Sequence, residues 1–202
     1  MRALSRRRFL TATALLAALP AFRPGRAEAA LTEAGARRLI DRVVADINAI
    51  INSGEGREAM FRDFEKLFKR YADLDVIARK VMGPAWRRAT PAQRRAFKEA
   101  FARYMARKYG KRFREFIGAE IKVTGVRRIK SFYEVRSVAR LRGQAPFEVR
   151  WLVSDKSGRT RFFNMFVEGV NMLTAEAQEV QAMLRKRKGD IDRLIRDLPK
   201  AA

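Results

Sequence analysis

Proton-transferring side chains in this sequence are restricted to carboxylates, tyrosines and lysines, because the chain contains no His and no Cys. Imidazole and thiol catalysis and most zinc or haem sites are therefore excluded. An enzyme would have to use Asp155 or Glu168 as its acid, with Tyr104 or Tyr133 as the proton donor. The sequence offers no paired acids, glycine-rich phosphate loop or cluster of metal ligands to support that chemistry. Glu168 precedes Gly169, where we expect a turn with positive φ, so a structural role is predicted for this pair.

The longest apolar stripe follows a clear helix start at Thr90. Thr90 is predicted to cap the helix, with Pro91 in the first position and Gln93 closing a capping box. Large apolar side chains then recur at spacings of mostly three and four along roughly 40 Å of helix: Phe97, Phe101, Tyr104, Met105, Tyr109, Phe113, Phe116 and Ile117. The opposite face is expected to be basic, with Arg94, Arg95, Lys98, Arg103, Arg107, Lys111 and Arg114. We expect the strands that follow to supply the broad surface that this stripe needs.

Other helices are predicted on both sides of the stripe. Apolar periodicity places them over residues 39–51, 60–71, 76–82, 174–188 and 191–198. The short third helix begins at Asp73 or Asp75, and the last one is capped by Asp190. Trp86 lies in the joint before the long helix, where we expect it to hold two elements together.

After Gly118 the apolar period falls from 3.6 to 2, which predicts half-buried antiparallel strands near 121–124, 133–142 and 147–153. A fourth strand over 160–167 is apolar on both faces and is expected to be covered on both sides. The order of helices, strands and helices predicts an α+β fold. In it, a curved antiparallel sheet of about four strands packs against N-terminal and C-terminal helices.

Residues 1–29 are predicted to be an export signal. Arg6–Arg7 precede Phe9–Leu10, an apolar run follows, and Ala27–Glu28–Ala29 has the small-x-small form of a cleavage site. The segment resembles a twin-arginine signal; a mitochondrial presequence or an uncleaved anchor are the alternatives. We therefore predict a periplasmic protein, exported by a twin-arginine or Sec signal, with one domain over residues 30–202.

The chain is strongly basic, with a formal charge of +23. Residues 1–29 contain six Arg and one Glu, so the remainder keeps +18. Such a charge in the cytoplasm would indicate a nucleic-acid partner. Export argues against nucleic acid and favours anionic phospholipid or acidic protein surfaces. The alternative is that the arginine-rich faces are simply solvated.

Four blocks of sequence resemble one family. Residues 75–83, 86–94 and 97–109 resemble the helical half of the MlaC family, the periplasmic phospholipid-binding proteins also called toluene-tolerance or Mla ABC-transport auxiliary components. Residues 164–172 resemble the segment that leads into the family's final helices. Three positions depart from the family pattern: Asn164 where Asp is usual, Asn171 where Ser is usual, and Thr160 where Trp is common.

The resemblance implies a sheet curled around a hydrophobic cavity, and a carrier of phospholipid between the outer and inner membranes. The implied partners are an inner-membrane ABC transporter with MCE domains and an outer-membrane lipoprotein–porin complex. No cofactor is implied, since the phospholipid is cargo. Each CH₂ exposed to water costs about 0.8 kcal/mol, so the cavity must be apolar. The expected lining residues, each also compatible with solid core, are Phe101, Tyr104, Met105, Val135, Val149, Trp151, Phe163 and Met165.

Three other classes remain open from the sequence. One is a hopanoid-associated or other lipid carrier of the same family. Another is an enzyme on a similar cone-shaped (NTF2-like) α+β fold, using the acids and tyrosines named above. The third is a basic adaptor that binds no small ligand. Mass spectrometry under non-denaturing conditions distinguishes bound lipid, bound cofactor and no ligand.

Overall fold

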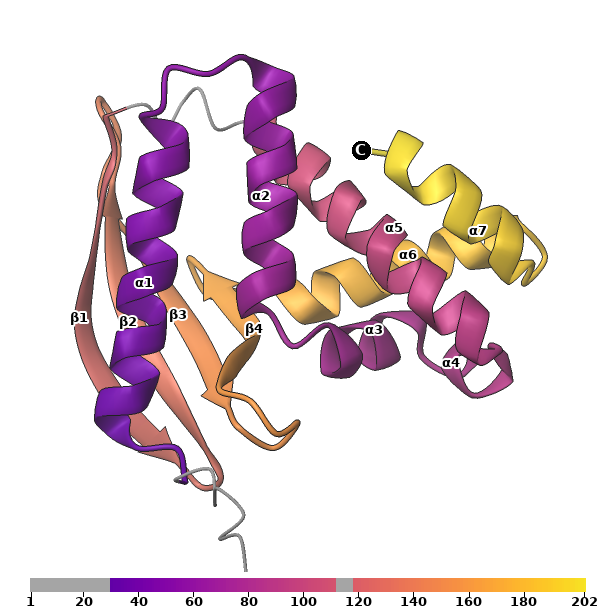
Figure 1. Cartoon of the computed structure of the whole chain (residues 1–202), viewed down its shortest axis with the longest axis horizontal. Helices are drawn as coiled ribbons and strands as arrows, with labels where there is room; N and C mark the ends of the chain where they lie inside the picture. Colours follow the sequence, from indigo (N-terminus) through magenta and orange to yellow (C-terminus); the bar gives the residue numbers. More distant parts are fainter. Residues whose placement is uncertain (1–29, 112–117) are drawn as a thin grey trace, which may run out of the picture.

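The computed structural model describes residues 30–111 and 118–202 (Figure 1). Five helices come first: α1 (Glu33–Ile51), α2 (Arg57–Tyr71), α3 (Leu74–Met82), α4 (Ala85–Arg88) and α5 (Pro91–Gly110). Five strands follow: β1 (Glu120–Ile129), β2 (Phe132–Arg140), β3 (Phe147–Ser154), β4 (Arg161–Val167) and β5 (Val170–Asn171). The chain ends in α6 (Met172–Lys186), α7 (Ile191–Asp197) and the 3₁₀ turn η2 (Leu198–Lys200). This order confirms the predicted α+β class.

Parts of the sequence-based predictions lie outside the described residues. These are the export signal over residues 1–29 and the last part of the apolar stripe, with Phe113, Phe116 and Ile117. Within the described ranges, no helix has the length and hydropathy that crossing a membrane requires.

The sheet is a five-stranded meander in the order β1-β2-β3-β4-β5, with every neighbouring pair antiparallel. The four predicted strands are present, and the two-residue β5 is added to them. β5 exists because Glu168 and Gly169 both have positive φ, 49° and 81°, which is the backbone of a tight hairpin turn. The turn was predicted at Gly169, whereas the short strand after it has too few residues to show alternation.

Capping side chains begin the helices much as predicted. The Thr90 hydroxyl accepts from Gln93 N at 3.1 Å, and Gln93 Oε1 accepts from Thr90 N at 3.0 Å, which completes the capping box. Of the two candidate caps for α3, the structure uses Asp73, whose Oδ1 accepts from Val76 N at 3.1 Å. Helix α6 begins two residues earlier than predicted, because Asn171 caps it through Thr174 N at 3.1 Å.

Helix α5 is buried around most of its circumference, which differs from the predicted one-sided stripe. Phe97, Phe101 and Tyr104 are fully buried as expected, but Ala100 and Ala102 on other sides are buried as well, at 4% and 0% exposure. Helices α2, α3 and α7 and the turn η2 all pack against it. Alanine is a weak signal in an apolar pattern, so the sequence predicted a broader basic face on α5 than the structure has.

The helix that covers the sheet is α1, so the prediction that the long helix packs on the strands is wrong. Helix α1 lies across β1, β2 and β3 (Figure 1) and buries Leu39, Ile40, Val43 and Val44. The apolar stripe of α1 packs directly on these strands. Helix α5 reaches the sheet through a ring of α2, since Phe68 lies 6.3 Å from Phe101 and 6.1 Å from Phe162, centroid to centroid.

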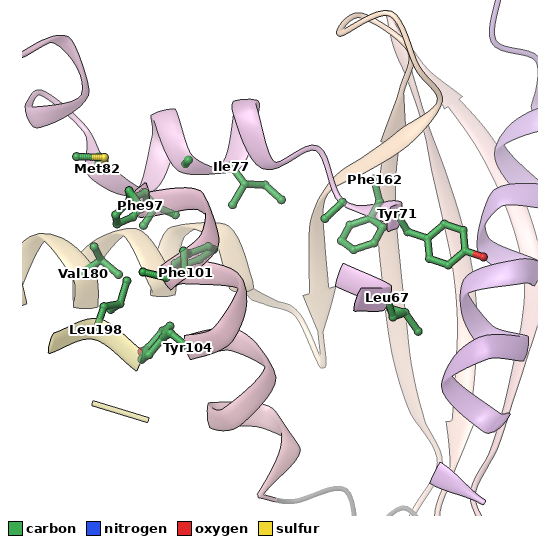
Figure 2. Close-up of a cluster of buried hydrophobic side chains, with 14 of the residues drawn as sticks. Leu67, Tyr71, Ile77, Met82, Phe97, Phe101, Tyr104, Phe162, Val180 and Leu198 are labelled. Atoms are coloured by element: carbon green, nitrogen blue, oxygen red, sulfur yellow. The ribbon is translucent and has the colours of Figure 1, made fainter. Parts of the chain in front are cut away.

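One main core connects the two sides of the molecule. Figure 2 shows it extending from Phe97, Phe101 and Leu198 among the helices to Leu67 and Phe162 beside the sheet. Aromatic and branched side chains from segments far apart in the sequence meet there, so the helices and the sheet form one folded unit.

Strand β4 is covered less completely than predicted. Phe162 is buried against the helices, but Phe163 and Phe166 are half-buried. Phe163 packs edge-on against Phe132 at 5.5 Å, and the Arg150 guanidinium lies 4.6 Å from the centre of the Phe166 ring. Phe163 and Phe166 are therefore shielded in part by side chains of other strands, a contact that the sequence pattern does not distinguish from a covering layer.

Candidate functional site

A small cavity lies where β4 meets α5 and α6, with α2 and α3 completing its wall. Its volume is about 30 Å³. Nine of its lining residues are apolar, and two are polar: Phe68, Ile77, Phe101, Met105, Phe162, Phe163, Met165, Met172 and Leu173, with Asn164 and Glu176. A mostly apolar wall with a few polar groups is the usual composition of a ligand pocket.

Four of the eight predicted cavity residues line this space: Phe101, Met105, Phe163 and Met165. The other four lie in packed core. Val135, Val149 and Trp151 belong to the main core on the sheet, and Tyr104 is fully buried with its ring 6.1 Å from that of Phe101. Whether any of the eight contacts lipid stays a prediction.

The sequence did not single out the part of the wall made by α2, α3 and α6: Phe68, Ile77, Met172 and Leu173. Phe68 and Ile77 looked like ordinary apolar positions of their own helices, and Met172 and Leu173 lie just before the predicted start of the next helix at residue 174. The missing information was where those helices lie relative to β4. The one available signal was the aromatic and Met content of the residues themselves.

Two hydrogen bonds hold the α2–α3 joint against β4. Asp73 N donates to Phe162 O at 2.7 Å, and the side-chain Nη1 of Arg161 donates to Ala72 O at 3.1 Å. The position of α3 relative to the sheet is therefore set by one backbone bond and one bond from an arginine side chain, both close to the cavity residue Phe162.

A pair of asparagines fixes the start of α6 to the same strand. Asn164 Oδ1 accepts from Met165 N at 2.8 Å and from Leu173 N at 3.1 Å, while its Nδ2 donates to Asn171 Oδ1 at 3.0 Å. Two of the three departures from the family pattern, Asn164 and Asn171, are therefore in contact. With Asp and Ser at these positions the hydroxyl of residue 171 would donate, whereas here the amide of residue 164 donates.

A buried polar cluster joins α5 to α6 at the cavity wall. Glu176 is 2% exposed, and its Oε1 accepts from Lys108 Nζ at 2.9 Å and from the Tyr109 hydroxyl. Lys108 also bonds to Glu179. Within the described residues, Glu176 Oε2 is buried without a hydrogen-bond partner, and the buried Tyr104 hydroxyl faces Glu179 without a hydrogen bond of normal geometry. A buried polar group without a hydrogen bond lowers the free energy of unfolding by about 1–3 kcal/mol, so the hydrogen bonding of this cluster is incomplete.

The pKa values of Tyr104, Lys108 and Tyr109 in this cluster are raised above their ordinary values. Burial raises the pKa of Tyr104 and of Tyr109, and the Glu176 carboxylate adds to both shifts. Burial alone would lower the pKa of Lys108, but its bonds to Glu179 and Glu176 outweigh burial and raise it. The tyrosines therefore stay protonated and the lysine stays charged near pH 7, which is the behaviour of a structural link between helices.

The acids considered for enzyme chemistry lie elsewhere. Asp155 Oδ2 accepts from Leu31 N at 2.8 Å, and Glu168 is exposed in the β4–β5 turn. Neither residue contributes to the cavity wall. In the described part of the chain, no group of three acids is placed to hold a metal ion.

A second hollow of about 280 Å³ lies between α2 and α5, and its wall is mostly charged. Arg103 lies 3.8 Å from Glu65 and Arg107 lies 3.9 Å from Glu58, nitrogen to oxygen. Burying such groups against hydrocarbon is costly. The smaller cavity is therefore the better candidate for an apolar ligand.

A helical cap, made of α2, α3, α5 and α6, lies on one side of an antiparallel sheet, and a mostly apolar cavity lies where cap and sheet meet. This arrangement places the chain among the α+β proteins with an apolar pocket between helices and sheet. A sequence model of the MlaC protein family matches residues 37–200, and the chain belongs to that family.

The proteins that resemble the chain include a curated relative and a solved structure. One is the intermembrane phospholipid transport system binding protein MlaC of Haemophilus influenzae, 24% identical over 137 residues, which are 65% of this chain. The alignment spans 63% of that relative's length. The other is the solved structure of a phospholipid-binding protein from Ralstonia solanacearum in complex with a phospholipid, with a TM-score of 0.69 and 19% identity. It covers 82% of this chain and 95% of its own, which establishes that the two share a fold.

Proposed function

We propose that the protein binds phospholipid between the sheet and its helical cap and carries it between membranes, as the binding protein of an intermembrane transport system. The observation that carries the proposal is the apolar cavity at the junction of β4, α5 and α6. Membership of the MlaC family and the fold shared with a phospholipid complex support it.

The cavity is much smaller than the proposed cargo. A volume of about 30 Å³ is on the scale of a water molecule, whereas pockets for drug-sized ligands measure about 300–1,000 Å³. Lipid binding therefore requires the cap and β4 to move apart. Met105, Met165 and Met172 line the space, and their unbranched side chains adapt to a new shape at low cost.

Burial of acyl chains would supply the free energy for this opening. At about 0.8 kcal/mol per CH₂, a chain of roughly 16 carbons gains on the order of 10 kcal/mol when it leaves water. The two polar atoms without a normal hydrogen bond, Glu176 Oε2 and Tyr104 Oη, lower the cost of rearranging the wall. The chemistry proposed for the site is therefore binding and release, with no bond made or broken.

The cellular setting is proposed from the sequence. The protein would be exported to the periplasm by residues 1–29 and would act there as one domain over residues 30–202. It would exchange lipid with an inner-membrane ABC transporter containing MCE domains and with an outer-membrane lipoprotein–porin complex. Replacing Arg6 and Arg7 by Lys tests the export route. Precursor should then remain in the cytoplasm, and unchanged periplasmic accumulation would remove the twin-arginine assignment.

Mass spectrometry of the purified protein under non-denaturing conditions tests the proposed ligand. We expect a phospholipid adduct that is lost in organic solvent and restored by adding phospholipid vesicles. A mass matching a hopanoid or another lipid would identify a different carrier of the same family. A bound cofactor, or no uptake of any lipid, would contradict the proposal.

A further inference from the structure

One stretch of the chain carries an uncompensated positive charge. Between Asp75 and Glu99 the sequence contains seven Lys or Arg and no acid. Lys98 pairs with Asp75 at 2.6 Å, and Arg94 is held by the Trp86 and Arg87 carbonyl oxygens at 3.0 and 3.4 Å. The other five are exposed and form no ion pair with any described residue: Arg79, Lys80, Arg87, Arg88 and Arg95. We call these five residues the basic corner.

The basic corner is one place on the molecule. Arg94 joins the start of α5 to α4, and its guanidinium lies 5.1 Å from the centre of the Trp86 ring. Figure 1 shows α3, α4 and the start of α5 together at the end of the molecule away from β1. Gln181 Nε2 donates to Val81 O at 3.2 Å, so α6 lies alongside. The last turn of α6 adds exposed Arg185 and Lys186 to this end.

Cations on the later turns of α5, and Lys69 on α2, behave differently. Lys69 bonds to Glu65 and Glu99, Lys108 bonds to Glu176 and Glu179, and Arg103 and Arg107 face acids of α2. Of the four arginines on α5 that the sequence placed on its basic face, Arg94, Arg95, Arg103 and Arg107, Arg95 alone belongs to the basic corner. Along α5, the exposed arginine without an ion pair therefore lies at the start of the helix.

We propose that the basic corner docks the protein on an anionic phospholipid surface. The inference rests on the proposed function, because it names the part of the helical cap that contacts the membrane during lipid exchange. Free, exposed Arg and Lys side chains attract a diffuse anionic surface without requiring a matching shape. Val76 is 41% exposed and lies one turn before Arg79 and Lys80 on α3, so it adds an apolar side chain among the cations.

The position of α3 favours a lipid surface over an acidic protein. Ile77, the residue after Val76, lines the cavity. Docking through Val76, Arg79 and Lys80 would therefore bring one wall of the cavity close to the bilayer with which cargo is exchanged. The exposed Val76 fits the same partner, because an apolar side chain among cations can enter the boundary between headgroups and acyl chains.

Vesicle sedimentation with charge-reversed variants tests the inference. The corner variant is Arg79→Glu/Arg87→Glu/Arg88→Glu, and the matched control is Arg128→Glu/Arg136→Glu/Arg140→Glu on β1 and β2, three exposed arginines without ion pairs in the described chain. Both lower the net charge equally. The probe is phosphatidylcholine vesicles containing about one quarter phosphatidylglycerol, at low salt where the Debye length is about 10 Å or more.

We expect the wild-type protein to bind these vesicles, to ignore pure phosphatidylcholine and to dissociate in about 1 M salt. Each cation near an anionic surface contributes roughly fivefold, so the corner variant should bind at least tenfold more weakly than the control. Equal weakening in both variants would show that net charge alone drives binding. Wild-type affinity in the corner variant, or no binding by the wild type, would also overturn the inference. The second of these outcomes leaves an acidic protein as the partner.

Two further measurements distinguish loss of docking from misfolding and from loss of lipid. The glutamine versions of both triple variants replace any glutamate variant that fails to fold, and they should give the same order of affinities. Phospholipid content is measured by mass spectrometry on every sample. Corner variants that retain lipid but lose vesicle binding support the docking surface. A wild-type protein that carries no lipid contradicts the proposed function. In that case the vesicle binding of the variants still decides whether the basic corner docks on an anionic membrane.

Discussion

The two sides of the core differ in how completely they are filled. On the sheet side, α1 lies on β1, β2 and β3, and Ile40, Val43, Val135 and Val153 are all fully buried. On the cap side, the equally buried Phe101 of α5 borders a cavity, and two polar atoms of the α5–α6 cluster have no hydrogen bond of normal geometry within the described residues. Both sides are made from the same kinds of side chain, so composition does not separate them.

This difference assigns the two sides different tasks. Filled, interlocking side chains transmit strain and resist rearrangement. A wall that borders a void and contains polar atoms without hydrogen bonds loses fewer favourable contacts when it moves. We therefore expect the sheet and α1 to keep their arrangement, and the contacts among β4, α5 and α6 to change, when cargo enters.

The largest effect is expected for a truncation on the filled side. Ile40→Ala should lower the free energy of unfolding by about 2–5 kcal/mol, because it opens a cavity that the surrounding strands cannot fill. Lipid content should not change. Met105→Ala at the cavity wall should cost no more than about 2 kcal/mol, since Met105 is only half-buried and adjoins existing space. Urea unfolding measures both, and equal losses would erase the contrast.

Enlarging a side chain on each side gives the next largest effect. Val149→Trp overpacks the filled side and should cost about 1–3 kcal/mol while lipid content is kept. Met165→Trp places the ring in the cavity, so stability should be nearly unchanged while co-purifying lipid falls. Thermal unfolding and mass spectrometry of the same preparations give the two readouts. Lipid loss in the Val149 variant, rather than the Met165 variant, would move the binding space to the sheet side.

High pH should loosen the cap side first. The raised pKa values of Tyr104 and Tyr109 mean that the folded state binds these protons more tightly than the unfolded chain, whose tyrosines titrate near 10. Their contribution to stability is therefore fully present below about pH 10 and is lost as the pH rises toward the folded-state values. The raised pKa of Lys108 acts in the same direction.

Hydrogen exchange across this pH range tests the order of opening. Amides of α5 and α6 should lose protection above about pH 10 before those of β2 and β3 do. Tyr109→Phe should cost about 1.5 kcal/mol near pH 7 by removing one hydrogen bond to a carboxylate, and should flatten the alkaline decline. Simultaneous opening of helices and strands would argue against a separate cap side.

The smallest effect is expected at the asparagine pair that joins β4 to α6. Asn164→Asp removes the donor to Asn171 Oδ1 and places two acceptors together, so stability should fall by about 1 kcal/mol. Adding Asn171→Ser restores a donor on the other residue and should recover most of the loss. Calorimetry of the single and double variants measures this coupling; additive losses would mean that the pair is not coupled.

Local chemistry made much of the fold predictable from the sequence. The Thr90–Gln93 capping box, the Asp190 cap and the alternating strands depend on neighbours within a few residues, and all three are present in the structure. The helix that packs on the sheet was not predictable, because α1 and α5 both carry large apolar side chains at helical spacing and no local feature indicates which of them contacts the strands. Alanines such as Ala102 hid how deeply α5 is buried.

The site was predictable in part, for the same reason. Phe101 and Met105 lie on the apolar side of a recognisable helix, and they do border the cavity. Val149 and Trp151 share a strand face that looked equally suitable, yet α1 fills the space above it. A sequence pattern indicates that a side chain is buried, but whether the far side holds atoms or space depends on the tertiary arrangement.

The two tryptophans of the chain give each of its proposed surfaces an optical reporter. The Trp151 ring lies edge-on to Phe162, a residue of the cavity wall, at 5.4 Å between centroids, and its indole N–H donates to Ser137 at 3.0 Å. Trp86 lies under Arg94 beside the basic corner. Indole emission responds to local polarity and to nearby charge, so cargo entry would perturb one fluorophore and contact with a bilayer would perturb the other. With Trp151 or Trp86 replaced by Phe in turn, loading and docking become separately observable in real time on unlabelled protein.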